Sequence, residues 1–254
     1  MARKITPIVV GNWKMNGTRR SATEVNRLIG GLKKMPHPVC NVMLCPPATL
    51  IGDFAKLSKR TRLQVGAQDC HVDTAGAHTG DVSTEMLHDA GARAVIVGHS
   101  ERRRDHGESN ADIHDKVQAA WRVSLTAIVC VGETRVERNA KRTLQIITRQ
   151  LSASLPATMD GDVMIAYEPV WAIGAARTPT PVAIREVHEH IRKRLNLRFG
   201  LRQGDRIPIL YGGSVTANNA GQMASIEQVN GVLVGGASLK YRDFLKIIYA
   251  FSAP

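Results

Sequence analysis

The sequence predicts an α/β fold, a single (β/α)8 barrel that covers residues 1–254. Three observations support this prediction. Short runs of β-branched and other apolar residues alternate along the chain with longer amphipathic segments. The short runs are apolar throughout, which is typical of parallel strands buried on both faces. No Pro/Gly/Ser-rich linker or change of composition divides the 254 residues, so one domain is expected.

Each predicted strand is a short apolar run, and the eight runs cover residues 5–10, 39–44, 62–67, 94–97, 126–131, 163–166, 207–210 and 232–234. The first run is followed by Gly11-Asn12-Trp13-Lys14. A Gly-x-Gly-x-x-Gly motif is therefore absent there. This argues against the alternative of a doubly wound sheet that binds a dinucleotide.

The predicted helices lie between these strands. Ser21 and Glu24 have the spacing of a capping box at the start of the first helix, and Pro181 stands near the first turn of the sixth. Gly91 is expected to end the short third helix. The eight helices cover residues 21–34, 48–58, 84–89, 110–122, 138–154, 181–198, 219–224 and 241–251.

Composition and charge exclude several classes of protein. Hydrophobic residues make up 43% of the chain, enough for a large core, and no run is long enough to span a membrane. The net charge of +12 is spread along the chain and aromatic residues are only 4%, so we expect no nucleic-acid partner. The N-terminus lacks the apolar segment of a signal peptide, and a cytoplasmic location is expected.

Cysteine and histidine spacing predicts neither a disulfide nor a metal site. Cys40, Cys45, Cys70 and Cys130 form no C-x-x-C pair and no zinc motif, so we expect reduced and mostly buried thiols. The pair formed by His188 and His190 would point to different faces of a helix. No metal ion is expected.

Polar residues follow several predicted strands, at the end of the barrel where active sites form. An amide and a cation follow the first strand, an imidazole and a carboxylate the fourth, and a carboxylate the sixth. Glycine pairs follow the seventh and eighth. These residues are Asn12, Lys14, His99, Ser100, Glu101, Glu168, Gly212, Gly213, Ser214, Gly235 and Gly236.

The chemistry of these residues favours a catalytic site for a phosphorylated substrate. The two glycine pairs allow backbone N–H groups to approach an anion, in the two loops where such barrels bind phosphate. Glu168 follows an apolar strand, where partial desolvation strengthens a general base. Taken singly, Glu168 could be salt-bridged, His99 packed in a loop and Lys14 solvated. Their convergence with the glycines on one rim favours the catalytic interpretation.

Five segments carry a resemblance to a known family. They are Gly-Asn-Trp-Lys-Met-Asn-Gly at 11–17, Val-Gly-His-Ser-Glu-Arg-Arg at 97–103, Tyr-Glu-Pro-Val-Trp-Ala-Ile-Gly at 167–174, Tyr-Gly-Gly-Ser-Val at 211–215 and Leu-Val-Gly-Gly-Ala-Ser-Leu at 233–239. In order and spacing, over essentially the whole chain, they resemble the triosephosphate isomerases, after which the TIM barrel is named.

The resemblance implies the interconversion of dihydroxyacetone phosphate and D-glyceraldehyde 3-phosphate in glycolysis and gluconeogenesis, without a cofactor or metal. It implies that Glu168 moves a proton between two carbons through an enediolate. His99 would act uncharged on the substrate oxygens, a case of pKa tuning for which this family is itself the standard example. Lys14 and Asn12 would stabilise negative charge. Glu101 would position Lys14.

The resemblance also assigns supporting roles. Ser100 would hold Glu168 while the site is open. A lid over residues 169–180 would bring Ile173, which with Leu233 clamps Glu168 in a dry environment that raises its basicity. Cys130 and Glu133 would support the base. The substrate phosphate would be bound by Gly174, Ser214, Gly235 and Gly236.

The family is usually a homodimer, in which the third loop reaches the partner's site. Here Thr79 would contact the partner near Asn12 and Lys14. Two departures from the family pattern affect these expectations. His78 replaces a bulky aromatic residue, from which we expect a weaker or pH-sensitive dimer, and Ala175-Ala176 stands at the rear hinge of the lid, from which we expect altered lid opening.

Two other functions remain as alternatives. One is an isomerase of a tetrulose phosphate on the same barrel, and the intact Trp171 and Ile173 with short site loops favour the three-carbon substrate over it. The other is a non-enzymatic basic binding protein, which would not need Asn12, Lys14, His99 and Glu168 together.

Overall fold

A computed structural model describes residues 5–35, 40–173 and 178–252. Its strands form one sheet in the order β3-β2-β1-β8-β7-β6-β5-β4, and every pairing is parallel. The strands are β1 (Ile8–Asn12), β2 (Asn41–Cys45), β3 (Leu63–Val65), β4 (Ala94–Val97), β5 (Thr126–Val131), β6 (Val163–Tyr167), β7 (Ile209–Tyr211) and β8 (Gly231–Val234).

The two edges of this sheet meet and close the barrel. Ala67, just after β3, forms a parallel bridge with Val95 of β4. The Ala67 N–H donates to the Ala94 carbonyl at 2.8 Å, and the Ile96 N–H donates to the Ala67 carbonyl at 2.9 Å. The predicted (β/α)8 barrel is therefore confirmed.

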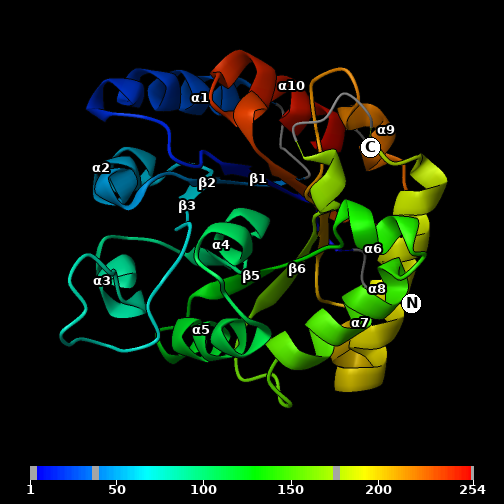
Figure 1. Ribbon diagram of the computed structural model, residues 1–254. Helices are drawn as coiled ribbons and strands as arrows, with labels where there is room; N and C mark the ends of the chain where they lie inside the picture. The colour runs from blue at the N-terminus through cyan, green and yellow to red at the C-terminus, as the bar shows by residue number, and fades with distance from the viewer. Residues whose placement is uncertain (1–4, 36–39, 174–177, 253–254) are drawn as a thin grey trace.

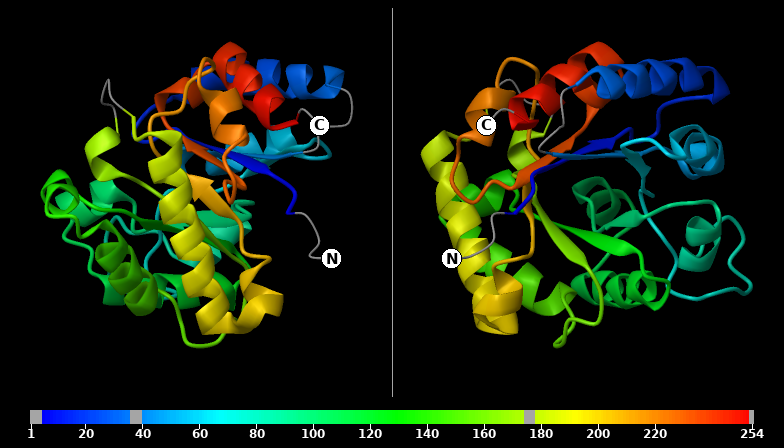
Figure 2. Two further views of the ribbon diagram at one scale, coloured as in Figure 1. Left: turned by 90° about the vertical axis from the view of Figure 1, so that its right-hand side faces the viewer. Right: turned by 180° about the vertical axis from the view of Figure 1, so that it is seen from behind.

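Helices surround the strands on the outside, as Figure 1 and the turned views of Figure 2 show. The first helix, α1, and the last, α10, lie side by side. The helices are α1 (Ala22–Lys34), α2 (Ala48–Ser58), α3 (Thr84–Asp89), α4 (Ser100–Asp105), α5 (Asn110–Arg122), α6 (Arg135–Asn139), α7 (Thr143–Ser154), α8 (Pro181–Gly204), α9 (Ala220–Ala224) and α10 (Tyr241–Ser252).

The core has two layers because successive strand residues point to opposite faces. In β1, Val9 packs against the helices in the outer cluster, whereas Ile8 and Val10 belong to the inner cluster. That inner cluster fills the barrel and includes Cys45 and Cys130. All four cysteines are free and buried, as the sequence predicted. Among the described residues, no helix is long and apolar enough to cross a membrane.

The strand boundaries differ from the predicted ones, mainly because apolar runs extend beyond the paired residues. β1 begins at Ile8 rather than residue 5, and it extends to Asn12 because that residue pairs with Cys45 of β2. β3 is shorter than 62–67. β6 and β7 each run one residue further than predicted, to Tyr167 and Tyr211, which pair with each other.

Several predicted helix boundaries were wrong. The helix predicted for 138–154 is divided into α6 and α7, with Lys141 between them at φ 57°. The sixth predicted helix continues past residue 198 to Gly204, across a kink at Gly200. Ser21 makes no capping bond to α1; its hydroxyl accepts the Thr18 N–H at 3.1 Å instead. The short helix α4 was not predicted.

One buried histidine couples the fold to pH. His188 lies on α8, has no exposed surface, and its Nδ1 is 3.1 Å from the Gln228 carbonyl. Its ring meets Tyr167 edge-on, with 5.9 Å between the ring centroids. Burial lowers the pKa of His188 from 6.5 to about 4. The folded chain therefore keeps this imidazole neutral at a pH where the unfolded chain protonates it.

We predict that the free energy of unfolding decreases as the pH falls from 6.5 toward 4, with His188 contributing about 3 kcal/mol of the loss at pH 4. In His188→Gln this contribution disappears, so the stability of the variant changes less with pH. Urea denaturation at pH 7 and pH 4.5 measures the difference. The exposed His88→Gln variant is the control, and an equally steep pH dependence in His188→Gln would contradict the assignment.

Candidate active site

The residues that follow the strands meet in one cavity of about 280 Å³ at the carboxyl ends of the strands. Its wall contains the candidate base, imidazole, cation and amide, together with the glycine pairs of the last two loops. Of the residues predicted from the sequence, those that line it are Asn12, Lys14, His99, Glu168, Ile173, Gly212, Gly213, Ser214, Leu233, Gly235 and Gly236.

Glu168 follows β6 and is only 2% exposed. One carboxylate oxygen, Oε1, lies 3.0 Å from Nε2 of His99. The other, Oε2, accepts the backbone N–H of Ser100 at 3.0 Å. Both oxygens thus have a donor, which is what a buried carboxylate needs in order to remain charged.

The hydrogen bonds of His99 indicate which nitrogen carries its proton. His99 precedes α4, and its Nδ1 accepts the backbone N–H of Glu101 at 3.2 Å. An accepting Nδ1 carries no proton, so the proton of the neutral ring lies on Nε2 and faces Glu168. The imidazole is therefore oriented as a donor into the cavity.

Glu168 and His99 shift each other's pKa in opposite directions. Burial is the largest influence on Glu168 and by itself raises its pKa, but His99, the Ser100 N–H and Lys14 together hold the pKa of this carboxyl below 4.5. Burial is also the largest influence on His99 and lowers its pKa, yet Glu168 outweighs it and raises the pKa above 6.5. In this arrangement the base is ionised at neutral pH. The higher basicity expected from Ile173 and Leu233 stays a prediction for a Glu168 that has left His99.

Lys14 lies in the left-handed region, with φ at 52°. A residue other than glycine pays about 1–3 kcal/mol for this conformation, so its surroundings must hold it. The Asn12 side chain accepts the Lys14 N–H at 2.9 Å, and Gln68 donates to the Lys14 carbonyl at 2.9 Å. The Lys14 ammonium reaches Glu101 Oε1 at 2.6 Å. Glu101 therefore does contact Lys14, as its predicted positioning role requires.

Part of the cavity wall is formed by backbone. Gly235 directly follows β8, and a short 3-10 helix, Gly236–Ser238, begins after it. A Cβ placed on Gly236 would meet nothing within 4 Å, so this backbone faces open space. Ser214 also lines the cavity. The fourth predicted phosphate ligand, Gly174, and the hinge residues Ala175 and Ala176 lie outside the described residues.

A second buried carboxylate fixes the start of the predicted lid. Glu133 has no exposed surface, and it accepts the indole N–H of Trp171 at 2.8 Å and the Tyr167 hydroxyl at 3.1 Å. The Val170 N–H donates to the Glu133 carbonyl at 3.1 Å. Glu133 thus joins the loop after β5 to the loop after β6.

Two residues that shape the site were not predicted from the sequence. Gln68 follows β3, where the rule that active sites lie at strand ends could have identified it; its amide also donates to the Cys45 carbonyl at 2.8 Å. Gly132 follows β5. A Cβ at Gly132 would lie 1.7 Å from the Glu168 carbonyl oxygen, so only glycine permits this close approach.

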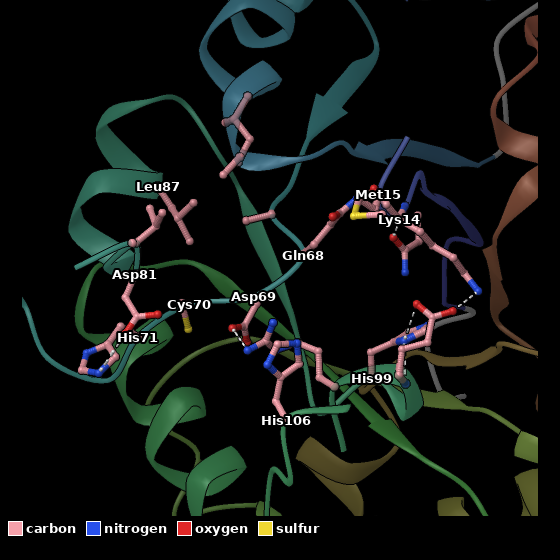
Figure 3. A pocket seen from close by; sticks show the side chains of 18 of the residues that line it. Lys14, Met15, Gln68, Asp69, Cys70, His71, Asp81, Leu87, His99 and His106 are labelled. Carbon is pink, nitrogen blue, oxygen red and sulfur yellow. Dashed lines mark hydrogen bonds and ion pairs between the residues drawn. The ribbon is translucent and has the colours of Figure 1, made fainter. Parts of the chain in front are cut away.

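A larger hollow of about 590 Å³ opens beside the cavity and shares Asn12, Lys14 and His99 with it. Figure 3 shows Lys14 and His99 at one end of this hollow and His71 with Asp81 at the other. Within one chain, the exposed loop that carries Thr79 therefore lies beside the catalytic cavity and does not enter it.

Comparisons with known proteins agree with this geometry. A sequence model of the family described as triosephosphate isomerase matches residues 7–251. A triosephosphate isomerase of Bradyrhizobium sp. (strain ORS 278) is 52% identical over 97% of this chain and 98% of its own length. One of Jannaschia sp. (strain CCS1) is 51% identical over 100% of both chains. The crystal structure of triosephosphate isomerase from Bartonella henselae superposes with a TM-score of 0.88 at 44% identity, covering 96% of this chain and 99% of that one.

We predict that Gly132→Ala lowers kcat/KM about 100-fold or more, because the added Cβ displaces the backbone of Glu168. Steady-state kinetics of triose phosphate isomerisation, the reaction of the matched family, measure the fall in kcat/KM. Gly52→Ala on α2 is the control, since a Cβ there meets nothing within 4 Å. Full activity in a folded Gly132→Ala variant would contradict the prediction.

Proposed function

The chain belongs to the triosephosphate isomerase family, and we propose that Glu168 is the base with which it interconverts dihydroxyacetone phosphate and D-glyceraldehyde 3-phosphate. The observation that carries this proposal is the contact of Glu168 with His99 in a cavity lined by paired glycines. This reaction belongs to glycolysis and gluconeogenesis. The comparisons do not support the alternative, a tetrulose phosphate isomerase.

Glu168 must leave His99 in order to act. Its Oε1 occupies Nε2 of His99, the nitrogen that has to donate to the substrate oxygens. We infer that the substrate displaces the carboxylate, which then removes the proton from the carbon beside the carbonyl. Separation from His99 and Ser100 removes two groups that hold down the pKa of Glu168, so the carboxylate becomes a stronger base as it reaches the substrate.

The same movement prepares His99. Separation from Glu168 removes the largest of the contributions that raise the pKa of His99, which favours the neutral imidazole. The ring then donates from Nε2 to the enediolate oxygens while Nδ1 keeps the Glu101 N–H. The N–H of a neutral imidazole has an acidity closer to that of the enediol than the N–H of an imidazolium has. The neutral ring can therefore exchange protons between the two oxygens of the enediolate.

Lys14 and Asn12 supply the positive end of the site. The Lys14 ammonium and the Asn12 amide both line the cavity beside His99. Preorganised donors of this kind are each worth about 3 kcal/mol of barrier when negative charge develops. Glu101, which contacts Lys14 at 2.6 Å, positions the ammonium rather than touching substrate.

The backbone N–H groups of Gly235 and Gly236, with Ser214 and Gly174, would bind the phosphate. Ile173 lies on the lid segment and lines the cavity together with the glycines. Closure over the phosphate would place Ile173 and Leu233 against Glu168 and exclude water. Exclusion of water also prevents loss of phosphate from the enediolate.

We further propose that residues 1–254 form one domain, that the chain acts in the cytoplasm, without a nucleic-acid partner or a cofactor in catalysis, and that it forms a homodimer. The hollow of about 590 Å³ beside Lys14, together with the exposed loop carrying Thr79, supports the dimer. In a symmetric pair the loop of each chain would enter the hollow of the other.

The experiment that tests the proposed function compares Glu168→Gln with the wild type in a coupled isomerisation assay. Loss of the base should lower kcat at least about 10³-fold while circular dichroism and stability show a folded chain. Glu227→Gln, an exposed carboxylate, is the matched control and should keep full activity. Retained turnover in Glu168→Gln would refute the assignment of the base, and an inactive wild type would refute the function.

The dimer is tested by Thr79→Arg, which places a long charged side chain where the partner's hollow would receive the loop. We predict at least about a tenfold rise in the dimer dissociation constant and a fall in kcat. Sedimentation equilibrium and the isomerisation assay measure the two effects. Thr23→Arg on the exposed face of α1 should change neither. Dimerisation unaffected by Thr79→Arg would contradict this interface.

A further inference from the structure

The loop between β3 and α3 is closed at its base. His71 forms a parallel bridge with Ser83, and its N–H donates to the Val82 carbonyl at 2.9 Å. Gly76 and Gly80 have φ values of 150° and 97° and allow the chain to turn back between these points. The loop therefore holds residues 71–83 in a compact ring, although most of it is exposed.

Three side chains with metal-binding atoms converge inside this ring. Ligand atoms of His71, Asp73 and His78 all lie within 4.8 Å of one another. Nε2 of His78 lies 2.9 Å from Oδ2 of Asp73, and the two imidazole rings lie 4.0 Å apart between centroids. Two ligands of a tetrahedral Zn²⁺ are about 3.3 Å apart, so shifts of about 1 Å would complete the geometry.

A fourth ligand is within reach. Oδ2 of Asp81 lies 3.8 Å from Nε2 of His71. Figure 3 shows His71 and Asp81 next to each other, at the end of the hollow away from Lys14 and His99. The site is thus separate from the catalytic cavity, whose lining includes none of these four residues.

The donor set selects a class of metal. Two imidazoles with two carboxylates suit Zn²⁺, Co²⁺ or Ni²⁺, whereas Mg²⁺ and Ca²⁺ prefer sites made of oxygen alone. With both histidines neutral, Asp73 and Asp81 supply two negative charges, which balance a divalent ion. This local balance contrasts with the formal net charge of +12 of the chain.

Binding has a definite cost at His71. Its Nδ1 accepts the Asp73 N–H at 3.1 Å, so the proton of the neutral ring lies on Nε2. Coordination through Nε2 moves that proton to Nδ1 and gives up this hydrogen bond, at a cost of about 1 kcal/mol. At His78 the metal would bind Nε2, which now lies 2.9 Å from Oδ2 of Asp73.

We propose that His71, Asp73, His78 and Asp81 form a binding site for one divalent transition-metal ion. No metal ion was expected from the sequence, because the cysteines form no zinc motif and His188 and His190 would point to different faces of a helix. The turn of the loop, not the spacing along the chain, brings the four proposed ligands together. A bound ion would cross-link the base of the loop to its distal part and hold the segment in one conformation.

The test uses the full chain without an affinity tag, freed of metal by a chelator. Calorimetry with Zn²⁺ should show one site per chain, and His71→Gln and His78→Gln should each weaken binding at least tenfold. His114→Gln is the matched control, because His114 also contacts a carboxylate, Asp115, at 3.0 Å, but among the described residues it belongs to no group of three possible metal ligands. That variant should bind like the wild type.

Cobalt supplies a second readout that does not depend on affinity. Co²⁺ at this site should give the visible absorption of tetrahedral nitrogen and oxygen ligation, and His78→Gln should abolish it. The proposal is overturned if no Zn²⁺ binds, if both histidine variants bind as the wild type does, or if Co²⁺ shows the strong near-ultraviolet absorption of thiolate ligation. Since neither readout measures turnover, the result is independent of the proposed catalytic function.

Discussion

The site depends on a buried carboxylate that must stay charged. Glu168 is almost completely enclosed, and burial alone would favour its neutral form. His99 and the N–H of Ser100 oppose this effect by giving each oxygen a donor. The contact therefore keeps Glu168 ionised, and in the proposed mechanism it also occupies the imidazole until the substrate competes for it. The higher pKa of His99 in this contact is the counterpart of the lower pKa of Glu168.

The barrel supplies the close approaches that this contact needs. The proposed catalytic groups stand at the ends of three strands, with Asn12 and Lys14 at β1, His99 after β4 and Glu168 after β6, so the closed sheet sets the distances between them. Gly132 lets the chain after β5 lie directly against the Glu168 backbone, and Glu133 fixes the beginning of the lid. Lys14 keeps a left-handed conformation because Asn12 and Gln68 hold its backbone. The ends of the strands hold the loops in place, and the loops in turn fix the positions of the site's side chains.

The sequence predicted the fold class and the positions of the catalytic candidates, because both follow from local patterns. Apolar runs mark strands, and polar residues directly after them mark the rim. It did not predict the division of 138–154, because Lys141 adopts a positive φ that no residue type there signals. Gly132 and the cluster around His71 depend on contacts between distant segments or on the path of one loop. Such contacts leave no periodic pattern in the sequence.

The most direct measurement is the titration of the Glu168 carboxyl by ¹³C NMR, with the signal assigned by its absence in Glu168→Gln. If His99 and Ser100 hold the charge, the carboxyl passes from pH 8 to pH 4.5, the ordinary pKa of glutamate, without reaching the midpoint of its titration. If burial prevails, the carboxyl takes up a proton within that range. The second result would contradict the central claim that Glu168 is kept as a carboxylate by its contact with His99.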